Sequence, residues 1–283
     1  MTATLSDWLF TSAFGVYMLA ALLCATEYAF TRHAAHPPAF AVRVGRSGIA
    51  LTVLGGLLHF GSLALRGIAT GRVPWGNMYE YLSAVGFVAV VAWLYAVARH
   101  DMRRMSVFVL LPVALMLFLA GNRLYAEASA LPPPLQSYWI VVHVAAAIMA
   151  SGVFLLSGVV SALHLLSTRR PRPGIRRLPP ADHLDELAYR SGTVGFLALT
   201  FAIVTGAVWA EQAWGRFWGW DPKETVAFAS WVCYAAYLHA RATAGWRGRG
   251  AAWINVVGLV LVLFNLFFVN LVAVGLHSYA GVD

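Results

Sequence analysis

The sequence predicts an all-α integral membrane protein, a polytopic helical bundle with about eight transmembrane helices. Hydrophobic residues make up 60% of the 283 residues, charged residues only 11%, and the mean hydropathy is +0.70. A soluble domain carries about 25% charged residues, so this composition belongs to a membrane protein. We find no internal repeat and no soluble domain, and we therefore expect a single membrane domain over residues 1–283.

Eight apolar segments are long enough to cross a hydrocarbon core about 30 Å thick. The expected spans are residues 9–30, 47–66, 78–98, 105–120, 138–166, 191–209, 225–240 and 251–275. At the start of the third span, Asn77 precedes Glu80 by three residues, which is a capping-box pattern. We therefore expect Glu80 to have a local role in starting that helix.

Basic residues are distributed unevenly over the loops between these spans. The loops at 31–46, 99–104, 167–190 and 241–249 hold 15 of the 20 lysines and arginines. Because cytoplasmic loops carry the excess of positive charge, we expect these loops in the cytoplasm and both termini on the extracytoplasmic side of the plasma membrane. The net charge of +8 follows from this topology, helped by anionic membrane lipid, and predicts no nucleic-acid partner.

The most unusual segment is WGRFWGWDPKET, residues 214–225, within an extracytoplasmic loop expected at residues 210–224, called the Trp loop below. Trp214, Trp218 and Trp220 fall within seven positions. Three indoles so close together offer a broad apolar surface for a flat ligand with a polar edge.

Two other interpretations of this segment stay open. Tryptophans at a membrane boundary are ordinary aromatic-belt residues, as we expect for Trp8, Trp75, Trp93, Trp139, Trp231 and Trp253. Asp221, Pro222 and Glu224 form a helix start, with Asp221 as the N-cap, Pro222 in the first helical position and Glu224 in the third. On this interpretation they fix the angle at which the Trp loop joins the seventh span.

Three of the nine histidines are candidates for a site. His143, near the outer end of the fifth span, and His277, past the outer end of the eighth, lie at the same membrane level as the Trp loop. Two neutral imidazoles and an aromatic surface are what a bis-histidine haem site needs. Arg216 and Lys223 are candidates to pair with the propionates. For each histidine singly, a role in packing is an equal alternative.

His59 is the third candidate, within the second span and in the outer half of the membrane. An ionisable side chain at this depth is a functional candidate by default. The alternative is a structural role, because burying a neutral imidazole hydrogen-bonded to a neighbouring helix costs far less free energy than burying a charge. We expect structural roles for His33, His36, His100, His164, His183 and His239.

Several kinds of chemistry have no motif in this chain. The two cysteines, Cys24 and Cys233, lie in separate spans, and no C-x-x-C-H segment is present for covalent attachment of haem to this chain. Nor is there a P-loop or an H-E-x-x-H motif. A nucleotide hydrolase, a zinc protease and a c-type cytochrome are therefore disfavoured.

The run WGRFWGWDPKET resembles the WWD signature of membrane proteins that handle haem in cytochrome c biogenesis. The companion segments VPWGNMYEYL, LQSYWIVVHV and VNLVAVGLHSYA resemble the CcsA/ResC family of system II more than the CcmC or CcmF relatives. The similarity extends from about residue 47 onward, with the motifs in the family's order. The first span is less diagnostic.

The resemblance implies a ligand set and partners. It implies that His143 and His277 are axial ligands to an external haem b, that Trp214, Trp218, Trp220 and Asp221 cradle the macrocycle, and that His59 helps receive haem within the membrane. It also implies a separate ResB/CcsB-type partner and an apocytochrome c whose C-x-x-C-H segment receives the haem.

We therefore expect this chain to present haem for covalent attachment to apocytochrome c, as a membrane subunit of a cytochrome c haem lyase complex. No residue resembles a catalytic nucleophile, so we expect its contribution to be orientation. The alternative is a haem exporter or binding protein without synthase activity. A membrane b-type cytochrome ranks last, because that class needs paired histidines at two membrane depths.

Overall fold

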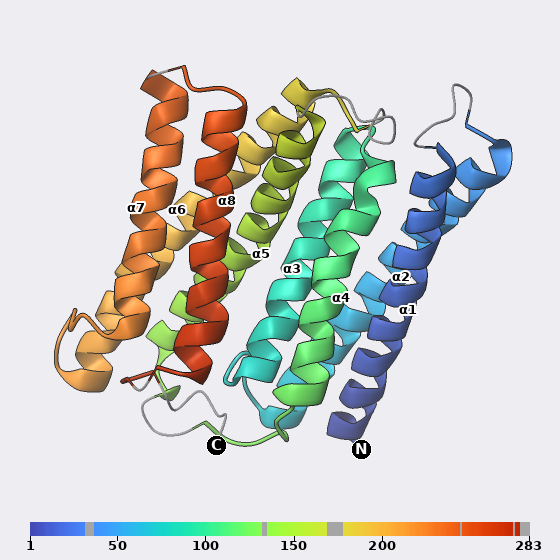
Figure 1. Ribbon diagram of the computed structural model, residues 1–283. Coiled ribbons are helices and arrows are strands. Elements are labelled where there is room, and N and C mark those ends of the chain that lie inside the picture. The colour runs from blue at the N-terminus through green and yellow to red at the C-terminus, as the bar shows by residue number, and fades with distance from the viewer. Residues whose placement is uncertain (32–36, 132–134, 169–177, 244, 274, 278–283) are drawn as a thin grey trace.

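The computed structural model describes residues 1–31, 37–131, 135–168, 178–243, 245–273 and 275–277 (Figure 1). Within these ranges the chain is helical and contains no strand. The helices are α1 (Thr2–Thr31), α2 (Ala39–Thr70), α3 (Met78–Arg99), η1 (Arg103–Met105), α4 (Ser106–Arg123), α5 (Tyr138–Ser167), α6 (Ala181–Trp214), α7 (Pro222–Thr243), α8 (Arg249–Phe264) and the π-helix η3 (Asn265–Val269). This confirms the predicted all-α bundle.

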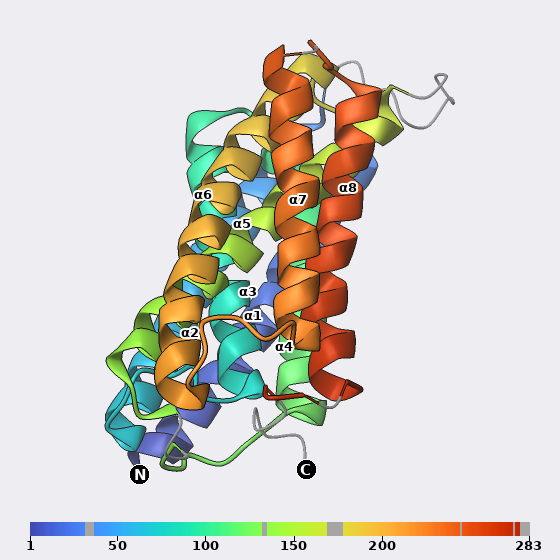
Figure 2. The same cartoon turned by 90° about the vertical axis from the view of Figure 1, so that its left-hand side faces the viewer.

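Seven segments of the described chain are long and apolar enough to cross a membrane. Helix α7 is also long, but it is not apolar enough to be among them. Its end turns carry Lys223, Glu224 and Arg241, which reduce its apolar content. In position, however, α7 runs beside α8 along the bundle (Figures 1 and 2). The chain is thus a multi-pass membrane protein.

The helices extend beyond the spans expected from hydropathy. The sixth span was expected at 191–209, whereas α6 covers Ala181–Trp214 and includes the segment LDELAYR. Hydropathy detects only the apolar middle of a helix, while polar end turns continue the same hydrogen-bonding pattern. Because Trp214 is helical and α7 begins at Pro222, the irregular part of the Trp loop is only residues 215–221.

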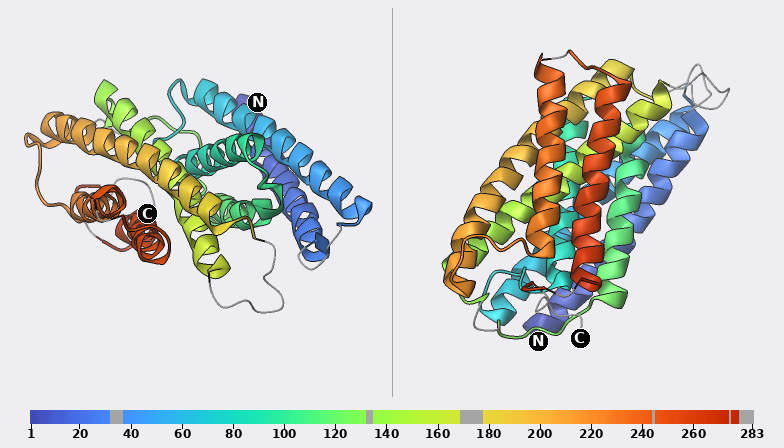
Figure 3. Two further views of the ribbon diagram at one scale, coloured as in Figure 1. Left: turned by 90° about the horizontal axis from the view of Figure 1, so that it is seen from above. Right: turned by 60° about the vertical axis from the view of Figure 1, so that its left-hand side comes forward.

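The bundle consists of two halves joined through α5. In the first half α1 packs on α2 and α4, and α3 packs on α4. In the second half α6 packs on α5 and α7 on α8, while α5 also contacts α3 and α8 (Figures 1 and 3). Helix α5 therefore lies at the junction, with one face toward each half.

The N-terminus, the Trp loop and residues 275–277 lie at one end of the bundle, called the Trp-loop end (Figures 1 and 2). The described parts of the four arginine-rich loops lie at the other end, as the charge distribution predicted. His33 and His36 lie outside the described residues.

Asn77 caps α3 as predicted, because its side chain accepts the N–H of Glu80 at 2.9 Å. The role expected for Glu80 was too narrow. Its carboxylate is 1% exposed, accepts from Arg66 Nε at 2.9 Å and Arg72 Nη1 at 2.7 Å, and also accepts the N–H of Gly76. Buried carboxylates need such partners, and here they tie α2, α3 and the intervening turn together.

The aromatic-belt interpretation is wrong for Trp93. Its side chain is fully buried in the core and its Nε1–H donates to Ser106 Oγ at 3.0 Å. A buried indole needs an acceptor for its N–H, and Ser106 supplies it. Trp8 and Trp253 are exposed, as belt residues are.

Candidate functional site

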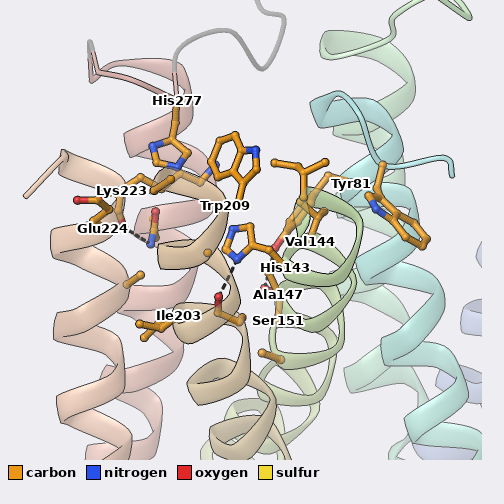
Figure 4. A pocket seen from close by; sticks show the side chains of 18 of the residues that line it. Tyr81, His143, Val144, Ala147, Ser151, Ile203, Trp209, Lys223, Glu224 and His277 are labelled. Carbon is orange, nitrogen blue, oxygen red and sulfur yellow. Dashed lines mark hydrogen bonds between the residues drawn. The ribbon is translucent and has the colours of Figure 1, made fainter. Parts of the chain in front are cut away.

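A large apolar cleft lies at the Trp-loop end, within the second half of the bundle (Figure 4). It encloses about 1550 Å³ of empty space, counting its opening to the outside. Its walls come from α5, α6, the Trp loop, α7, α8 and η3, and the turn at residues 73–78 closes the side facing the first half. His143 and His277 both line it, so the structure brings together the two histidines that were predicted as a pair.

His143 is held in one orientation by α6. Its Nδ1 lies 2.7 Å from the carbonyl oxygen of Ala202, and because a carbonyl can only accept, Nδ1 carries the proton. The ring lies so close to α6 that a Cβ at Gly206 would stand 2.7 Å from it. The lone pair of His143 is therefore on Nε2.

His277 is held by Asp221, the residue predicted to cap α7. Its Nδ1 lies 2.9 Å from Asp221 Oδ1, and the N–H of Leu276 donates to Asp221 Oδ2 at 2.7 Å. Asp221 also performs its predicted capping role, because Oδ1 accepts the N–H of Lys223 at 3.0 Å. One carboxylate thus joins the start of α7 to a segment 55 residues away.

The electrostatics of this pair favour a neutral imidazole and a charged carboxylate. Burial lowers the pKa of His277, and the hydrogen bond to Asp221 offsets this only in part. Burial alone would raise the pKa of Asp221, but hydrogen bonds from His277, Leu276 and Lys223 lower it to about 2. His277 is therefore neutral near pH 7, with its proton on Nδ1, which is the form that binds a metal through Nε2.

Trp209 connects the two histidines, although the sequence did not single it out. Its ring is parallel to that of His143 within 8°, with centroids 6.2 Å apart, and its centroid lies 5.9 Å from that of His277 (Figure 4). Trp214 packs edge-on against both Trp209 and His277, at 4.8 and 4.9 Å. The only sequence signal for Trp209 was its place on the helix leading into the Trp loop.

The other residues of the Trp loop divide between the cleft and its outside. Trp218 lines the cleft, whereas Trp220 is 65% exposed and packs on Trp218 and Phe228. Within the described chain, Trp220 is the non-glycine residue with a left-handed backbone, at φ 56°. Such a conformation is strained and persists because its surroundings impose it; here Glu224 accepts the N–H groups of Gly219 and Asp221 on either side.

Of the two basic residues predicted to pair with the propionates, the structure places only one in the cleft. Lys223 lines the cleft, and its ammonium donates to Asn270. Arg216 is exposed and does not line the cleft. Asn265 and Asn270, at the π-helix η3, add polar groups to the same wall, and π-helical turns often occur at functional sites.

Trp75, which the sequence placed in the aromatic belt, also lines the cleft. Its Nε1 and that of Trp218 are buried with no hydrogen-bond acceptor among the described residues. An unpaired buried donor costs about 1–3 kcal/mol, which a ligand with acceptor atoms would recover.

His59 lies outside the cleft, in the first half of the bundle. It is fully buried, with Nε2 2.9 Å from Ser83 Oγ and Nδ1 3.5 Å from the Tyr17 hydroxyl. The rings of Phe10, Tyr17 and Phe87 surround it edge-on. The structure does not bring His59 together with His143 and His277.

This site fits haem. Two imidazoles with Nδ1 protonated provide Nε2 lone pairs for iron, the apolar walls suit a porphyrin, and buried indole N–H groups suit its polar edge. By contrast, the described residues contain no cluster of three or more His, Cys, Asp or Glu side chains able to hold a bare metal ion.

Comparison with known proteins agrees with this chemistry. Residues 75–277 match the family described as Cytochrome C assembly protein, and this range contains both cleft histidines. The cytochrome c biogenesis protein CcsA of Parasynechococcus marenigrum is 37% identical, over 83% of this chain and 87% of that protein. CcsA of a Synechococcus species is 33% identical over 94% of each chain.

The solved structure of the cytochrome c heme lyase CcmF has a similar fold, with a TM-score of 0.66 and 17% sequence identity over 94% of this chain. The present chain covers 47% of that structure, about half its length.

Proposed function

The chain belongs to the cytochrome c assembly protein family, and we propose that its cleft holds haem b for covalent attachment to an apocytochrome c. The observation that carries the proposal is the pair His143 and His277, which line one cleft with Nδ1 of each engaged by the protein. Cytochrome c maturation requires haem handling, and this arrangement leaves Nε2 of each ring as the iron-binding atom.

When bound, haem would supply an iron that accepts imidazole nitrogens and vinyl groups to which cysteine thiols add. His143 and His277 would hold the iron; the ring of Trp209 lies parallel to that of His143, and Trp214 packs edge-on against His277. Trp218 supplies apolar surface together with the α5 and α6 walls, and Lys223 and Asn270 supply polar groups for the propionates. These residues orient the ligand, and orientation is what turns a slow bimolecular addition into an effectively intramolecular one.

We place the cleft on the extracytoplasmic side of the plasma membrane, because the arginine-rich loops lie at the opposite end of the bundle. The apocytochrome would offer its C-x-x-C-H segment from that side, and the histidine of that segment would take the place of one of the two cleft histidines. A ResB/CcsB-type membrane protein is the proposed partner. The alternative role is export, in which this chain passes haem outward and the partner carries out attachment.

The test is the absorption spectrum of the purified protein after haem loading. Wild type should show a low-spin bis-histidine spectrum, and His143→Ala or His277→Ala should lose it and regain it in part with added imidazole. His183→Ala, an exposed histidine on α6, is the matched control and should match wild type. An unchanged spectrum in the double variant His143→Ala/His277→Ala would overturn the proposal.

A second experiment separates attachment from export. The protein is purified with and without the coexpressed partner and mixed with haem and an apocytochrome c, and covalently bound haem is measured. Attachment that needs both chains supports the synthase role, and attachment by the partner alone supports export.

A further inference from the structure

We propose that Asp221 makes the two axial ligands unequal: it holds His277 as a strong, anion-backed iron ligand, while His143 is the weaker ligand and the one exchanged. This inference rests on the proposed haem function. Asp221 is here a positioning residue, acting on iron through His277.

The contacts of Asp221 carry the inference. Its carboxylate is 4% exposed, Oδ1 accepts Nδ1–H of His277 at 2.9 Å and Oδ2 accepts the N–H of Leu276 at 2.7 Å. The chain passes so close that a Cβ at Gly275 would stand 2.5 Å from Oδ2. Both oxygens therefore hold the segment that carries His277, and its ring cannot turn without breaking the bond to Oδ1.

The acceptor for His143 is of a different kind. Its Nδ1–H donates to the neutral main-chain carbonyl of Ala202, which also accepts the hydroxyl of Thr205. Hydrogen bonds to an ionised acceptor are roughly twice as strong as neutral ones. A carboxylate therefore gives His277 more imidazolate character and makes it the better donor to iron.

Two consequences follow for haem bound in the cleft. The more basic ligand favours ferric over ferrous iron, so Asp221 lowers the midpoint potential. The bond from iron to His143 is the weaker of the two. The incoming histidine of the apocytochrome therefore replaces His143, while His277 stays bound to iron.

Asp221 also caps α7, so a loss of haem alone would not separate the two roles. Glu224 provides the matched control. It belongs to the same helix start and also lines the cleft, but its carboxylate accepts the N–H groups of Gly219 and Asp221 and acts on His277 only through its charge. Glu224→Gln removes one negative charge from the same loop and keeps an oxygen for the caps.

The experiment is a redox titration of haem-loaded protein, followed by absorption. Asp221→Asn should raise the midpoint potential by about 59 mV, which corresponds to a tenfold change in the preference for ferric over ferrous iron. Glu224→Gln should shift the potential by less, because the charge of Glu224 acts on His277 only through space. Equal potentials in Asp221→Asn and wild type, or equal shifts in both variants, would overturn the inference.

A second measurement leaves Asp221 intact, in case Asp221→Asn does not accumulate. Ferrous haem in His143→Ala is ligated by His277 alone, and in His277→Ala by His143 alone. Resonance Raman spectra should place the iron–histidine stretch at higher frequency in His143→Ala, and equal frequencies would overturn the inference. Failure of the proposed function would look different, because wild type itself would then show no bis-histidine spectrum.

Discussion

The first half of the bundle fully buries His59, the second half partly buries His143, and the two histidines differ in what surrounds them. His59, on α2, is enclosed by rings from α1 and α3, and both of its nitrogens face hydroxyl groups. His143 is fixed at Nδ1 only and lines an open cleft. Burial alone therefore does not identify a site; what counts is which polar atoms the protein leaves for a ligand.

The charged groups of the two halves show the same contrast. In the first half, Glu80 is satisfied by Arg66, Arg72 and Gly76, all of them part of the protein. In the second half, Asp221 is engaged with His277, whose ring lines the cleft. The first network is structural, and the second serves the ligand as well as the helix.

Breaking the network of the first half should have the largest effect on stability. Glu80→Ala leaves the buried Arg66 and the partly buried Arg72 without their carboxylate, and loss of one partner from a buried ion pair costs about 3–5 kcal/mol. Thermal melting in detergent should show a large decrease. Glu186→Ala is the matched control, because its pair with Arg190 is exposed on both sides and should contribute little.

If the contrast between the halves is correct, Glu80→Ala protein that survives should still give the bis-histidine spectrum. A normal melting temperature would show that the arginines find other partners. Loss of the spectrum in well-folded protein would show that the network also shapes the cleft.

The fold and half of the site were predictable from local patterns in the sequence. Hydropathy locates the spans, and the caps at Asn77 and Asp221 depend only on residues within three positions. The bond from Asp221 to His277 depends on how α7 and the segment after α8 approach each other. Likewise, no local sequence pattern identifies Trp209, because only tertiary packing places it against both histidines.

Acid should weaken the second half through Asp221. The pKa of Asp221 in the folded protein, about 2, lies below the ordinary aspartate value of 3.8, so the stabilisation is fully present above about pH 4 and is lost as the pH falls toward 2. The difference in pKa corresponds to about 2 kcal/mol. Melting temperatures of wild type and Asp221→Asn between pH 2 and 6 should converge toward low pH, and a constant gap between them would contradict this assignment.

His59→Ala separates packing from haem transit. If His59 is a packing residue, its replacement leaves the Ser83 hydroxyl without its hydrogen-bond partner. The free energy of unfolding should then fall by about 1–3 kcal/mol. The haem content per folded molecule should stay at the wild-type value. Reduced haem content with an unchanged melting temperature would instead support the transit role that the family resemblance implied.

The smallest effect should come from the outermost tryptophan, and it sharpens the contrast within the second half itself. Trp218 lines the cleft, so Trp218→Ala should weaken haem binding by about 1–3 kcal/mol, a scale taken from aromatic stacking on nucleic-acid bases. Trp220 is mostly exposed and outside the cleft, so Trp220→Ala should change haem affinity by less than about 0.5 kcal/mol. Haem titration of both variants measures the difference.

Because Trp220 has a left-handed backbone conformation, Trp220→Gly should relieve strain there and raise the melting temperature if the conformation serves only the loop. A loss of haem affinity in Trp220→Ala equal to that of Trp218→Ala would mean that the loop closes over the ligand and brings Trp220 to it.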